Sequence, residues 1–272
     1  MSDTICFFGA TGGTTNASLT LTLTSQSHGA IALVRNPDKL RQQLISQQKV
    51  DESLIDKKLT IVQGNALDVE DVKRALLANI VAGKDDRLPF MLKSGLGGAP
   101  ALQFDIYHPL HIITLNNPIL CESAAKTLVC GLSELYAEQP GLAQNKPAVT
   151  FVSTTGVSRG AEDVPLAMRF LYHQLLAVPH ADKRKMEDTF RDNMLEDAPV
   201  FKSVTGIRPT LLSGAGIIAE GKGLETVRAG TECKPETGYT ISRADVGSWV
   251  FENVIRTQGK GRWIGEMVSL TS

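Results

Sequence analysis

The chain has 272 residues, of which 42% are hydrophobic and 21% are charged, so it can bury a large core and is not expected to be disordered. Its 28 basic and 29 acidic residues give a net charge of −1, which argues against a nucleic-acid partner because such proteins present a basic face. No run of 18 apolar residues occurs, and the first apolar run already begins at Thr4, so neither a membrane span nor a cleavable signal is expected.

The cysteine and histidine spacings do not indicate a metal site. The chain has four cysteines, Cys6, Cys121, Cys130 and Cys233. They form no CxxC motif, and we interpret them as reduced, buried thiols of a cytoplasmic protein. His108 and His111 are three residues apart, but Pro109 lies between them and no carboxylate or cysteine completes a ligand set, so no metal is expected.

Strand-like and helix-like patterns alternate along the whole chain. The expected strands are the apolar runs 4–8, 30–34, 59–62, 88–92, 149–152, 203–207 and 239–241. The expected helices cover 17–27, 37–48, 69–81 and 245–255. Strands separated by helix-length segments indicate βαβ units, and continuous apolar runs are typical of parallel strands buried on both faces. The sequence therefore predicts an α/β fold with one doubly wound parallel sheet, as a single domain over residues 1–272.

A glycine-rich turn directly follows the first strand and opens a helix. It contains Gly9, Thr11, Gly12, Gly13 and Thr14. Glycines let the backbone approach a diphosphate, and the helix N-terminus offers free N–H groups and a partial positive charge. A strand, a glycine turn and a helix in this order predict dinucleotide binding. Thr15 stands where a GxxGxxG pattern has its third glycine, so helix and strand are expected to pack slightly farther apart there.

The residue at the end of the second strand indicates which dinucleotide binds. Sites that prefer NAD usually place Asp or Glu here to bind the ribose hydroxyls, whereas an arginine can pair with the 2′-phosphate of NADP. Arg35 occupies this position and favours NADP(H), with Asn36 and Lys39 as candidate helpers. The alternative interpretation is a solvated surface arginine.

Further segments carry a family resemblance. They are FFGATGG (7–13), ALVRNPDKL (32–40), VQGNALD (62–68), FVSTTGV (151–157), DKRKME (182–187), GIRPTLL (206–212) and SRADVG (242–247). With these segments in this order, the chain resembles the atypical short-chain dehydrogenases/reductases with NmrA-like, NAD(P)H-binding sequences. It is most similar to their fungal branch, whose members often serve secondary metabolism. The resemblance implies a Rossmann-type sheet with a small C-terminal substrate-binding lid.

The resemblance also implies further cofactor-binding positions. They are Asn65 and Ala66 beside the adenine, Ser94, Gly95 and Leu96 after the fourth strand, Thr154, Lys183, and Pro209 and Thr210 beside the nicotinamide amide. Thr155 falls where the family places its active-site serine. The substrate would bind above the cofactor, between the segments 95–118, 156–180 and 214–240.

The usual proton donor of this family is missing. Ordinary members use a Tyr-x-x-x-Lys pair, in which the lysine holds the nicotinamide ribose and the tyrosine protonates the carbonyl oxygen. Lys183 fits the lysine position, but Pro179 stands four residues earlier and has no proton to give. Tyr172 is followed at its fourth place by Leu176 rather than by lysine.

Three interpretations of this departure remain open. The first is that another acid replaces the tyrosine, and the candidates are Asp163, Tyr172, His173 and His180. Asp163 lies in the loop after the fifth strand, where burial would raise its pKa far enough for proton donation. The second is that the substrate, such as an iminium, needs little acid. The third is that no hydride transfer occurs and the protein only holds or senses the dinucleotide.

The expected function is NADP(H)-dependent reduction of a C=O or C=N bond of a small organic molecule, by a monomer or homodimer. The alternatives are an isomerase or cyclase that holds NADP(H), similar to the Diels–Alderases of indole-alkaloid pathways, and a non-catalytic NmrA-like redox sensor. The alkaloid-pathway reductases pair an Asp with an Arg. Asp163 fits the first role, and Lys126 and Arg169 are candidates for the second.

Overall fold

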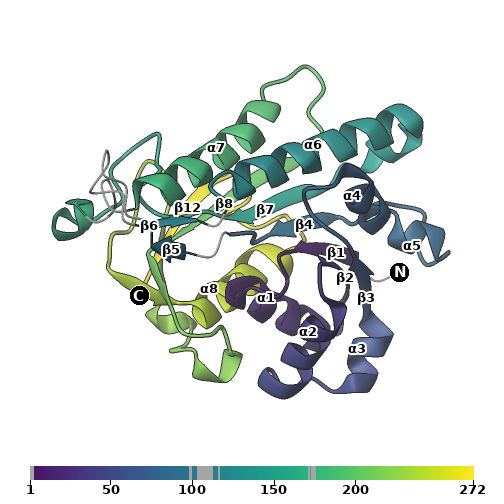
Figure 1. Cartoon of the computed structure of the whole chain (residues 1–272), viewed down its shortest axis with the longest axis horizontal. Coiled ribbons are helices and arrows are strands. Elements are labelled where there is room, and N and C mark those ends of the chain that lie inside the picture. Colours follow the sequence, from purple (N-terminus) through teal and green to yellow (C-terminus); the bar gives the residue numbers. More distant parts are fainter. Residues whose placement is uncertain (1–2, 98–99, 103–112, 116, 171, 173–175) are drawn as a thin grey trace.

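The computed structural model describes residues 3–97, 100–102, 113–115, 117–170, 172 and 176–272. Within these residues the centre of the molecule is an eight-stranded sheet with the order β10-β12-β8-β7-β4-β1-β2-β3 (Figure 1). The strands are β1 (Asp3–Phe8), β2 (His28–Val34), β3 (Leu59–Gln63), β4 (Met91–Ser94), β7 (Ala148–Val152), β8 (Ser203–Pro209), β10 (Arg228–Gly230) and β12 (Met267–Thr271). Every neighbouring pair is parallel except β10 with β12. The strand order reverses between β1 and β4, which confirms the Rossmann-type doubly wound fold.

Helices cover both faces of this sheet (Figure 1). α1 (Gly13–Thr24) and α8 (Arg243–Val250) pack on one face, and α4 (Val69–Leu76), α6 (Leu120–Glu138) and α7 (Ala177–Asn193) pack on the other. The other helices that lie wholly within the described residues are α2 (Pro37–Gln42), its π-helical continuation (Gln43–Gln47), α3 (Glu52–Lys58), α5 (Ala78–Val81), the π-helical continuation of α8 (Phe251–Ile255), and short 3₁₀ turns at Pro140–Asn145, Leu166–Met168, Ile218–Glu220 and Leu224–Thr226. Two layers of apolar side chains fill the space between the sheet and these helices.

The first helix is anchored by a close contact with α8. A Cβ atom on Gly247 would lie 2.5 Å from the Cβ of Ala17, so the two helices approach through a position that lacks a side chain. The Ser18 hydroxyl donates a hydrogen bond to the Gly247 carbonyl at 3.1 Å. This packing fixes the N-terminus of α1 at the carboxyl end of β1, where the dinucleotide-binding prediction requires it.

Two expectations about the C-terminal part were wrong. The run 239–241 is a strand, β11 (Thr240–Ser242), but it pairs with β9 (Leu211–Ser213) in a separate two-stranded sheet. The seventh parallel strand of the main sheet is β12, which pairs with β8 and follows the helix that was expected to close the chain. The sequence of β12 (MVSLT) is a short run interrupted by Ser269, so it gives a weak strand signal, and only pairing with β8 makes it a core strand.

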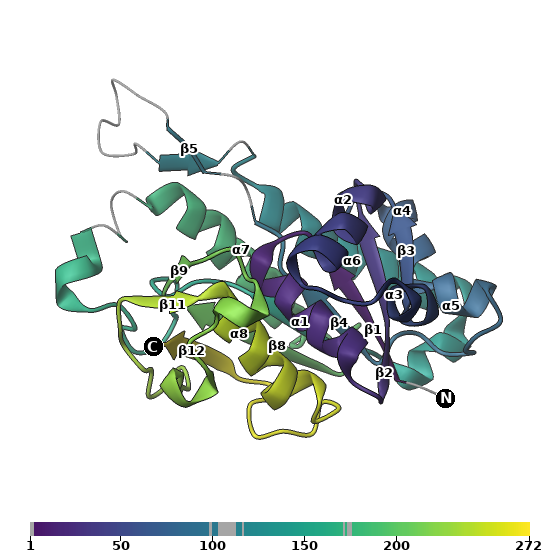
Figure 2. The same cartoon turned by 90° about the horizontal axis from the view of Figure 1, so that it is seen from below.

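The segments between the main strands differ from the expectation as well. The first helix begins at Gly13 rather than at residue 17, and the 19-residue helix α6 was not expected. β5 (Pro100–Leu102) and β6 (Ile113–Leu115) form a second two-stranded sheet, which stands apart from the main sheet (Figure 2). Within the segment 214–240, β10 is an edge strand of the main sheet.

The cysteines were interpreted as buried thiols, and this is only half right. Cys6 and Cys121 are buried, whereas Cys130 and Cys233 are exposed. Cys130 lies on the outer side of α6, and Cys233 lies in the loop after β10. The amino-acid type alone does not indicate that these two positions are exposed. A search for membrane-spanning helices finds none that is long and apolar enough among the residues that the structure describes.

Candidate active site

The glycine turn lies where β1 and β4 diverge. Gly9 has a left-handed backbone, with φ of 78°, and the Gly12 N–H donates to its carbonyl at 2.9 Å. A Cβ atom on Gly9 would lie 3.0 Å from the Gly95 carbonyl carbon. The turn after β1 and the residues after β4 therefore meet backbone to backbone at the switch point of the sheet, a contact that only a residue without a side chain allows.

Thr15 does not push the first helix away from the sheet, because its side chain fits opposite a glycine. It is 1% exposed, and a Cβ atom on Gly95 would lie only 1.7 Å from its hydroxyl oxygen. In the family pattern a glycine in the helix lets the helix and the strand pack closely. Here the helix has Thr15 instead, and Gly95 in the facing segment leaves room for its side chain.

We expect Gly95→Ala to lower the free energy of unfolding by about 1–3 kcal/mol, because an added methyl group in a filled site forces its neighbours apart. Thr15→Ala alone should have little effect, since the Thr15 hydroxyl has no hydrogen-bond partner among the described residues. The double variant should recover most of the loss in urea unfolding. If Gly95→Ala and the double variant have the same urea midpoint of unfolding, the Thr15 side chain does not occupy the space opposite Gly95 in the way described.

The segment after β9 packs directly on the glycine turn. A Cβ atom on Gly13 would lie 2.4 Å from the Ala215 carbonyl oxygen, and a Cβ atom on Gly216 would lie equally close to the Gly13 carbonyl oxygen. The Gln48 amide donates to the Gly216 carbonyl at 2.8 Å and to the Asn16 side chain at 2.9 Å. The predicted lid segment therefore begins on the floor of the predicted cofactor site.

The residues after β2 and β3 form the adenosine side of the expected site. Arg35 is exposed, and no ion pair of its guanidinium occurs within the described part of the chain. The Asn36 side chain accepts from the Lys39 N–H at 2.9 Å and so caps α2, which gives it a structural role. Asn65 is exposed and its side chain accepts from the Leu67 N–H at 3.1 Å. It shapes the turn after β3, where Ala66 is half-buried.

Lys183 is held at the carboxyl ends of two central strands. Its ammonium group donates to the Leu96 and Val152 carbonyls, both at 2.8 Å, which leaves one of its three hydrogens for a ligand. The preceding residue, Asp182, is 2% exposed, and its carboxylate accepts from the Cys121 N–H at 3.0 Å and the Glu122 N–H at 2.9 Å. By capping α6 from α7, Asp182 fixes the direction in which Lys183 points.

A cavity of about 260 Å³ opens beside Lys183. Its described lining residues are Gly97, Cys121, Ser153, Thr154, Tyr172, Leu176, Pro179, His180, Lys183, Pro209, Thr210, Leu211, Leu212 and Arg243. The cavity brings together residues predicted from four separate segments: Thr154, Tyr172 with His180, Lys183, and Pro209 with Thr210. None of its described lining residues comes from 214–240, so a lid function of that segment stays a prediction. His173 and most of the segment 98–116, with His108 and His111, lie outside the described residues.

Tyr172 is the cavity residue best suited to give a proton. It is 2% exposed, and its ring centre lies 5.3 Å from that of His180. Burial and, to a lesser degree, the negative charge of Asp163 raise the pKa of its phenol, and together they outweigh the lowering by the Thr155 hydroxyl and the Leu211 backbone. The Thr155 hydroxyl also lies 3.5 Å from the Pro209 carbonyl. Tyr172 therefore stays protonated at neutral pH.

Comparison with known proteins places the chain among fungal oxidoreductases. No known family profile matches it. It is 38% identical to the oxidase pynE of Aspergillus niger over 98% of both chains. It is 37% identical to the reductase pytE of Aspergillus terreus over 98% of this chain and 97% of that protein. The chain belongs to this fungal oxidoreductase family. The fungal branch and the oxidoreductase class that the motifs implied are thus confirmed.

Solved structures show the same fold in this fungal oxidoreductase. A short-chain dehydrogenase/reductase from Veillonella parvula in complex with NADP has a TM-score of 0.64 and is 16% identical, over 100% of this chain and 95% of that one. ChuY, an anaerobillin reductase from Escherichia coli O157:H7, has a TM-score of 0.57 and is 17% identical, over 98% of this chain and 96% of that one. At these identities the likeness shows the fold, which is that of the short-chain dehydrogenases/reductases.

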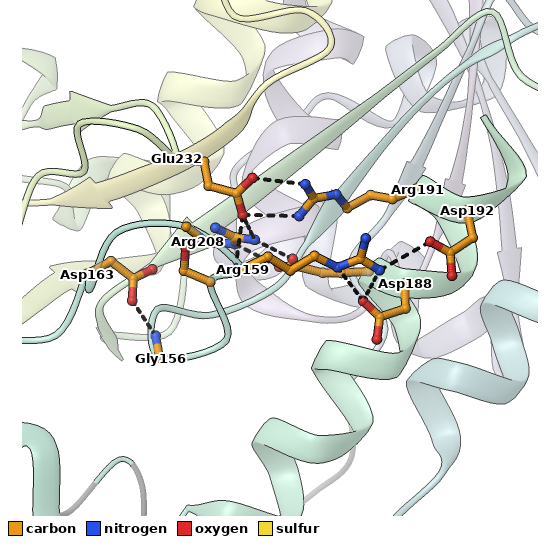
Figure 3. A network of polar contacts seen from close by, with 11 residues as sticks. Gly156, Arg159, Asp163, Asp188, Arg191, Asp192, Arg208 and Glu232 are labelled. Carbon is orange, nitrogen blue, oxygen red and sulfur yellow. Dashed lines mark hydrogen bonds and ion pairs between the residues drawn. The ribbon is translucent and has the colours of Figure 1, made fainter. Parts of the chain in front are cut away.

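Asp163 is buried but is not among the described residues that line the cavity. It is 1% exposed, one carboxylate oxygen accepts from the Gly156 N–H at 2.7 Å (Figure 3), and the other has no hydrogen-bond partner among the described residues. Burial raises its pKa, although the Gly156 N–H and the charge of Arg208 lower it in part. Asp163 is absent from the described lining residues, and so are Lys126 and Arg169. Those two cations form surface ion pairs with Glu122 and Glu162.

A buried ion-pair network joins the sheet to α7 in the oxidoreductase (Figure 3). The Arg208 guanidinium of β8 donates to both Glu187 oxygens, at 2.9 and 2.6 Å, and to Glu232 at 2.8 Å. Arg191 donates to both oxygens of Glu232. These arginines hold the pKa of Glu232 at about 2, although its burial alone would raise it. The network fastens the loop after β10 to α7 and gives no cation to the cavity.

Proposed function

We propose that the protein is an NADP(H)-dependent reductase that transfers hydride to the C=O bond of a small, largely apolar organic molecule. The observation that carries this proposal is the cavity beside the switch point, where Tyr172 and Lys183 line the same space. Lysine near the nicotinamide ribose and a phenol near the substrate oxygen are the two groups that this reduction uses. Tyr172 thus supplies, from another position in the chain, the proton that Pro179 cannot give.

The residues around the glycine turn fit a dinucleotide. The left-handed Gly9 brings the turn against Gly95 and leads into the N-terminus of α1, whose free N–H groups suit a diphosphate, and the buried Ser153 hydroxyl, which lines the cavity, has no partner among the described residues. The residues that would hold NADP(H) are Gly9, Thr11, Gly12, Gly13 and Thr14 at the diphosphate, Arg35 at the 2′-phosphate, Asn65 and Ala66 at the adenine, and Ser94, Gly95, Leu96, Thr154, Lys183, Pro209 and Thr210 at the nicotinamide riboside. When bound, NADPH supplies the hydride.

The protein's own groups supply the proton and the orientation. The Tyr172 phenol donates its proton to the substrate oxygen as negative charge develops there. Its ring packs beside His180 and lines the cavity. Lys183, fixed by two carbonyls, presents its remaining hydrogen to the ribose.

The charges of the cavity favour a carbonyl over an iminium substrate. Its described lining residues include two cations, Lys183 and Arg243, and no carboxylate. A positively charged iminium would therefore meet like charges, whereas the oxygen of a carbonyl gains negative charge during reduction and is stabilised by them. Leu176, Leu211 and Leu212 provide apolar surface for the rest of the substrate.

The proposal is tested by following NADPH oxidation at 340 nm with two matched sets of compounds: neutral cyclic ketones and the cyclic iminium ions of the same ring systems. We expect turnover of ketones and little turnover of iminium ions. Turnover of iminium ions alone would contradict the assignment of the bond. Silence with both sets, combined with tight NADP(H) binding in calorimetry, would favour the redox sensor instead.

The coenzyme preference is tested at Arg35. A charge-assisted hydrogen bond to phosphate contributes about 1.5–3 kcal/mol, so Arg35→Ala should weaken NADPH binding about 10- to 100-fold and leave NADH binding nearly unchanged. The measurement is the Kd of both coenzymes by fluorescence or calorimetry. Lys84→Ala, which removes an exposed charge beside Thr60 near the amino end of β3, is the matched control. An unchanged ratio of the two Kd values in Arg35→Ala would contradict this assignment.

A further inference from the structure

Lys93 is a lysine that lies entirely inside the protein. It is in β4, is 0% exposed, and ranks among the largest fully buried side chains. Its strand neighbours are Phe7 of β1 and Thr150 of β7. The ammonium nitrogen has no hydrogen-bond partner among the described residues. An amine buried without a partner destabilises a fold, so packing does not explain why a lysine stands here.

The charged groups around Lys93 do not neutralise it. It alternates with Leu92 and so faces the same side of the sheet as Met91, which packs under α1 and α8. α1 carries no titratable side chain. α8 and its continuation carry Arg243, Asp245 and Glu252, which bond to the Gly214 carbonyl, to Ser242 and the backbone of 222–223, and to Arg256, respectively. The charge that acts on Lys93 is Lys183 of α7, and this like charge, after burial, lowers the pKa of Lys93 to about 7.

The position of Lys93 relates it to the glycine turn. Lys93 pairs with Phe7, and two residues farther along both strands Gly95 meets Gly9. Two residues of a strand span about 7 Å, which is close to the reach of an extended lysine side chain. The field of Lys183, which is bound at the Leu96 and Val152 carbonyls, acts on the Lys93 amine. An extended Lys93 side chain that follows its strand reaches the level of Gly9 and Gly95, at the carboxyl edge of the sheet where dinucleotides bind.

We propose that Lys93 is a second cationic group of the dinucleotide site. Its amine takes up one proton from solvent when a diphosphate occupies the glycine turn, and the positive charge so formed balances the negative charge of the diphosphate. This inference rests on the proposed NADP(H) binding. An anion in the turn offsets the like charge of Lys183 and favours the charged form of the buried amine. In low-dielectric surroundings this effect is much larger than it would be in water.

Calorimetric titration of the wild-type protein with NADP⁺ at pH 8, in phosphate and in Tris, measures the protons taken up on binding, because the two buffers differ in ionisation enthalpy. We expect close to one proton per dinucleotide bound. Since a tenfold change in affinity accompanies each pH unit when one proton is linked to binding, the Kd should rise about tenfold between pH 7.5 and 8.5.

Lys93→Met should abolish both the proton uptake and the pH dependence of the Kd. It should also fold at least as stably as the wild type, because it replaces an unpartnered buried amine by an apolar side chain of similar length. Proton uptake that is the same in Lys93→Met as in the wild type would overturn the proposal. If the variant does not fold, the wild-type titration still decides, because a wild type that binds NADP⁺ without proton uptake overturns it.

Binding measurements distinguish a failure of the proposed function from a failure of the proposed role of Lys93. A wild-type protein that binds neither NADP⁺ nor NAD⁺ overturns the proposed function, and the role of Lys93 falls with it. A wild-type protein that binds NADP⁺ with a Kd independent of pH leaves the reductase proposal intact and overturns the role of Lys93 alone.

Discussion

Tyr172→Phe is expected to lower kcat by about 10²- to 10⁴-fold, the usual contribution of a positioned general acid, while the Kd of NADPH changes little. The phenol is the group removed, and its ring, which packs beside His180, is kept. Stopped-flow measurement of NADPH oxidation under single-turnover conditions separates the chemical step from product release.

The matched control for this variant is Tyr136→Phe. Tyr136 is also partly buried, but its hydroxyl donates to the Val200 carbonyl at 3.0 Å and is not among the residues that line the cavity. It should retain full kcat. Full activity of Tyr172→Phe would show that the acid is elsewhere, and Asp163→Asn would then be the next variant, because Asp163 is buried and its burial raises its pKa.

The pH profile follows from the direction of the Tyr172 shift. Burial raises the pKa of the phenol, and a general acid works only in its protonated form. The chemical step should therefore stay constant through neutral pH and fall only on the alkaline side, above the ordinary tyrosine range near 10. In Tyr172→Phe this alkaline fall should disappear.

Arg208→Met is expected to lower the free energy of unfolding by about 3–5 kcal/mol, because removing one partner of a buried ion pair leaves the other charge uncompensated. Arg208 is 1% exposed, and Glu187, to which it donates two hydrogen bonds, is also 1% exposed. After the substitution Glu187 must be buried as a lone charge or take up a proton. Urea unfolding at pH 7 measures the loss.

Two further variants make this stability prediction specific. Arg191→Met removes an arginine that pairs with Glu232 from a more exposed position and should have a smaller effect. The double variant Glu187→Leu/Arg208→Met removes both charges of the pair and should recover part of the stability, since apolar replacements of a buried pair are often neutral. A double variant as unstable as Arg208→Met would contradict the role of the lone carboxylate.

Local patterns predicted the parts of the site that are contiguous in the sequence. The glycine turn, Arg35 and Lys183 were recognised because each lies at a fixed place relative to one strand or one motif, and the fold places all three at the carboxyl edge of the sheet. The same reasoning found the parallel sheet, because buried parallel strands are continuous apolar runs.

Contacts between distant segments could not be predicted in this way. Asp182 caps α6 across 61 residues of sequence, and the pairing of Thr15 with Gly95 appears only when β1 and β4 lie side by side. Asp163 was favoured as the acid because its loop follows a strand end, but one of its carboxylate oxygens binds the Gly156 N–H and Asp163 is not among the described residues that line the cavity. The fold placed two of the four candidate acids, Tyr172 and His180, on the cavity wall.

The contact between Gly13 and the segment 215–216 joins two regions that lie at opposite ends of the chain. A Cβ atom on Gly13 would meet the Ala215 carbonyl oxygen, and one on Gly216 would meet the Gly13 carbonyl oxygen, both at 2.4 Å. Neither position can therefore carry a side chain unless the opposite backbone moves away. An insertion or a larger residue in one of these segments therefore requires the backbone of the other segment to shift away. Natural variation at these two places should be correlated, and grafting the first βα unit of a relative onto this protein should succeed only together with that relative's own stretch after β9.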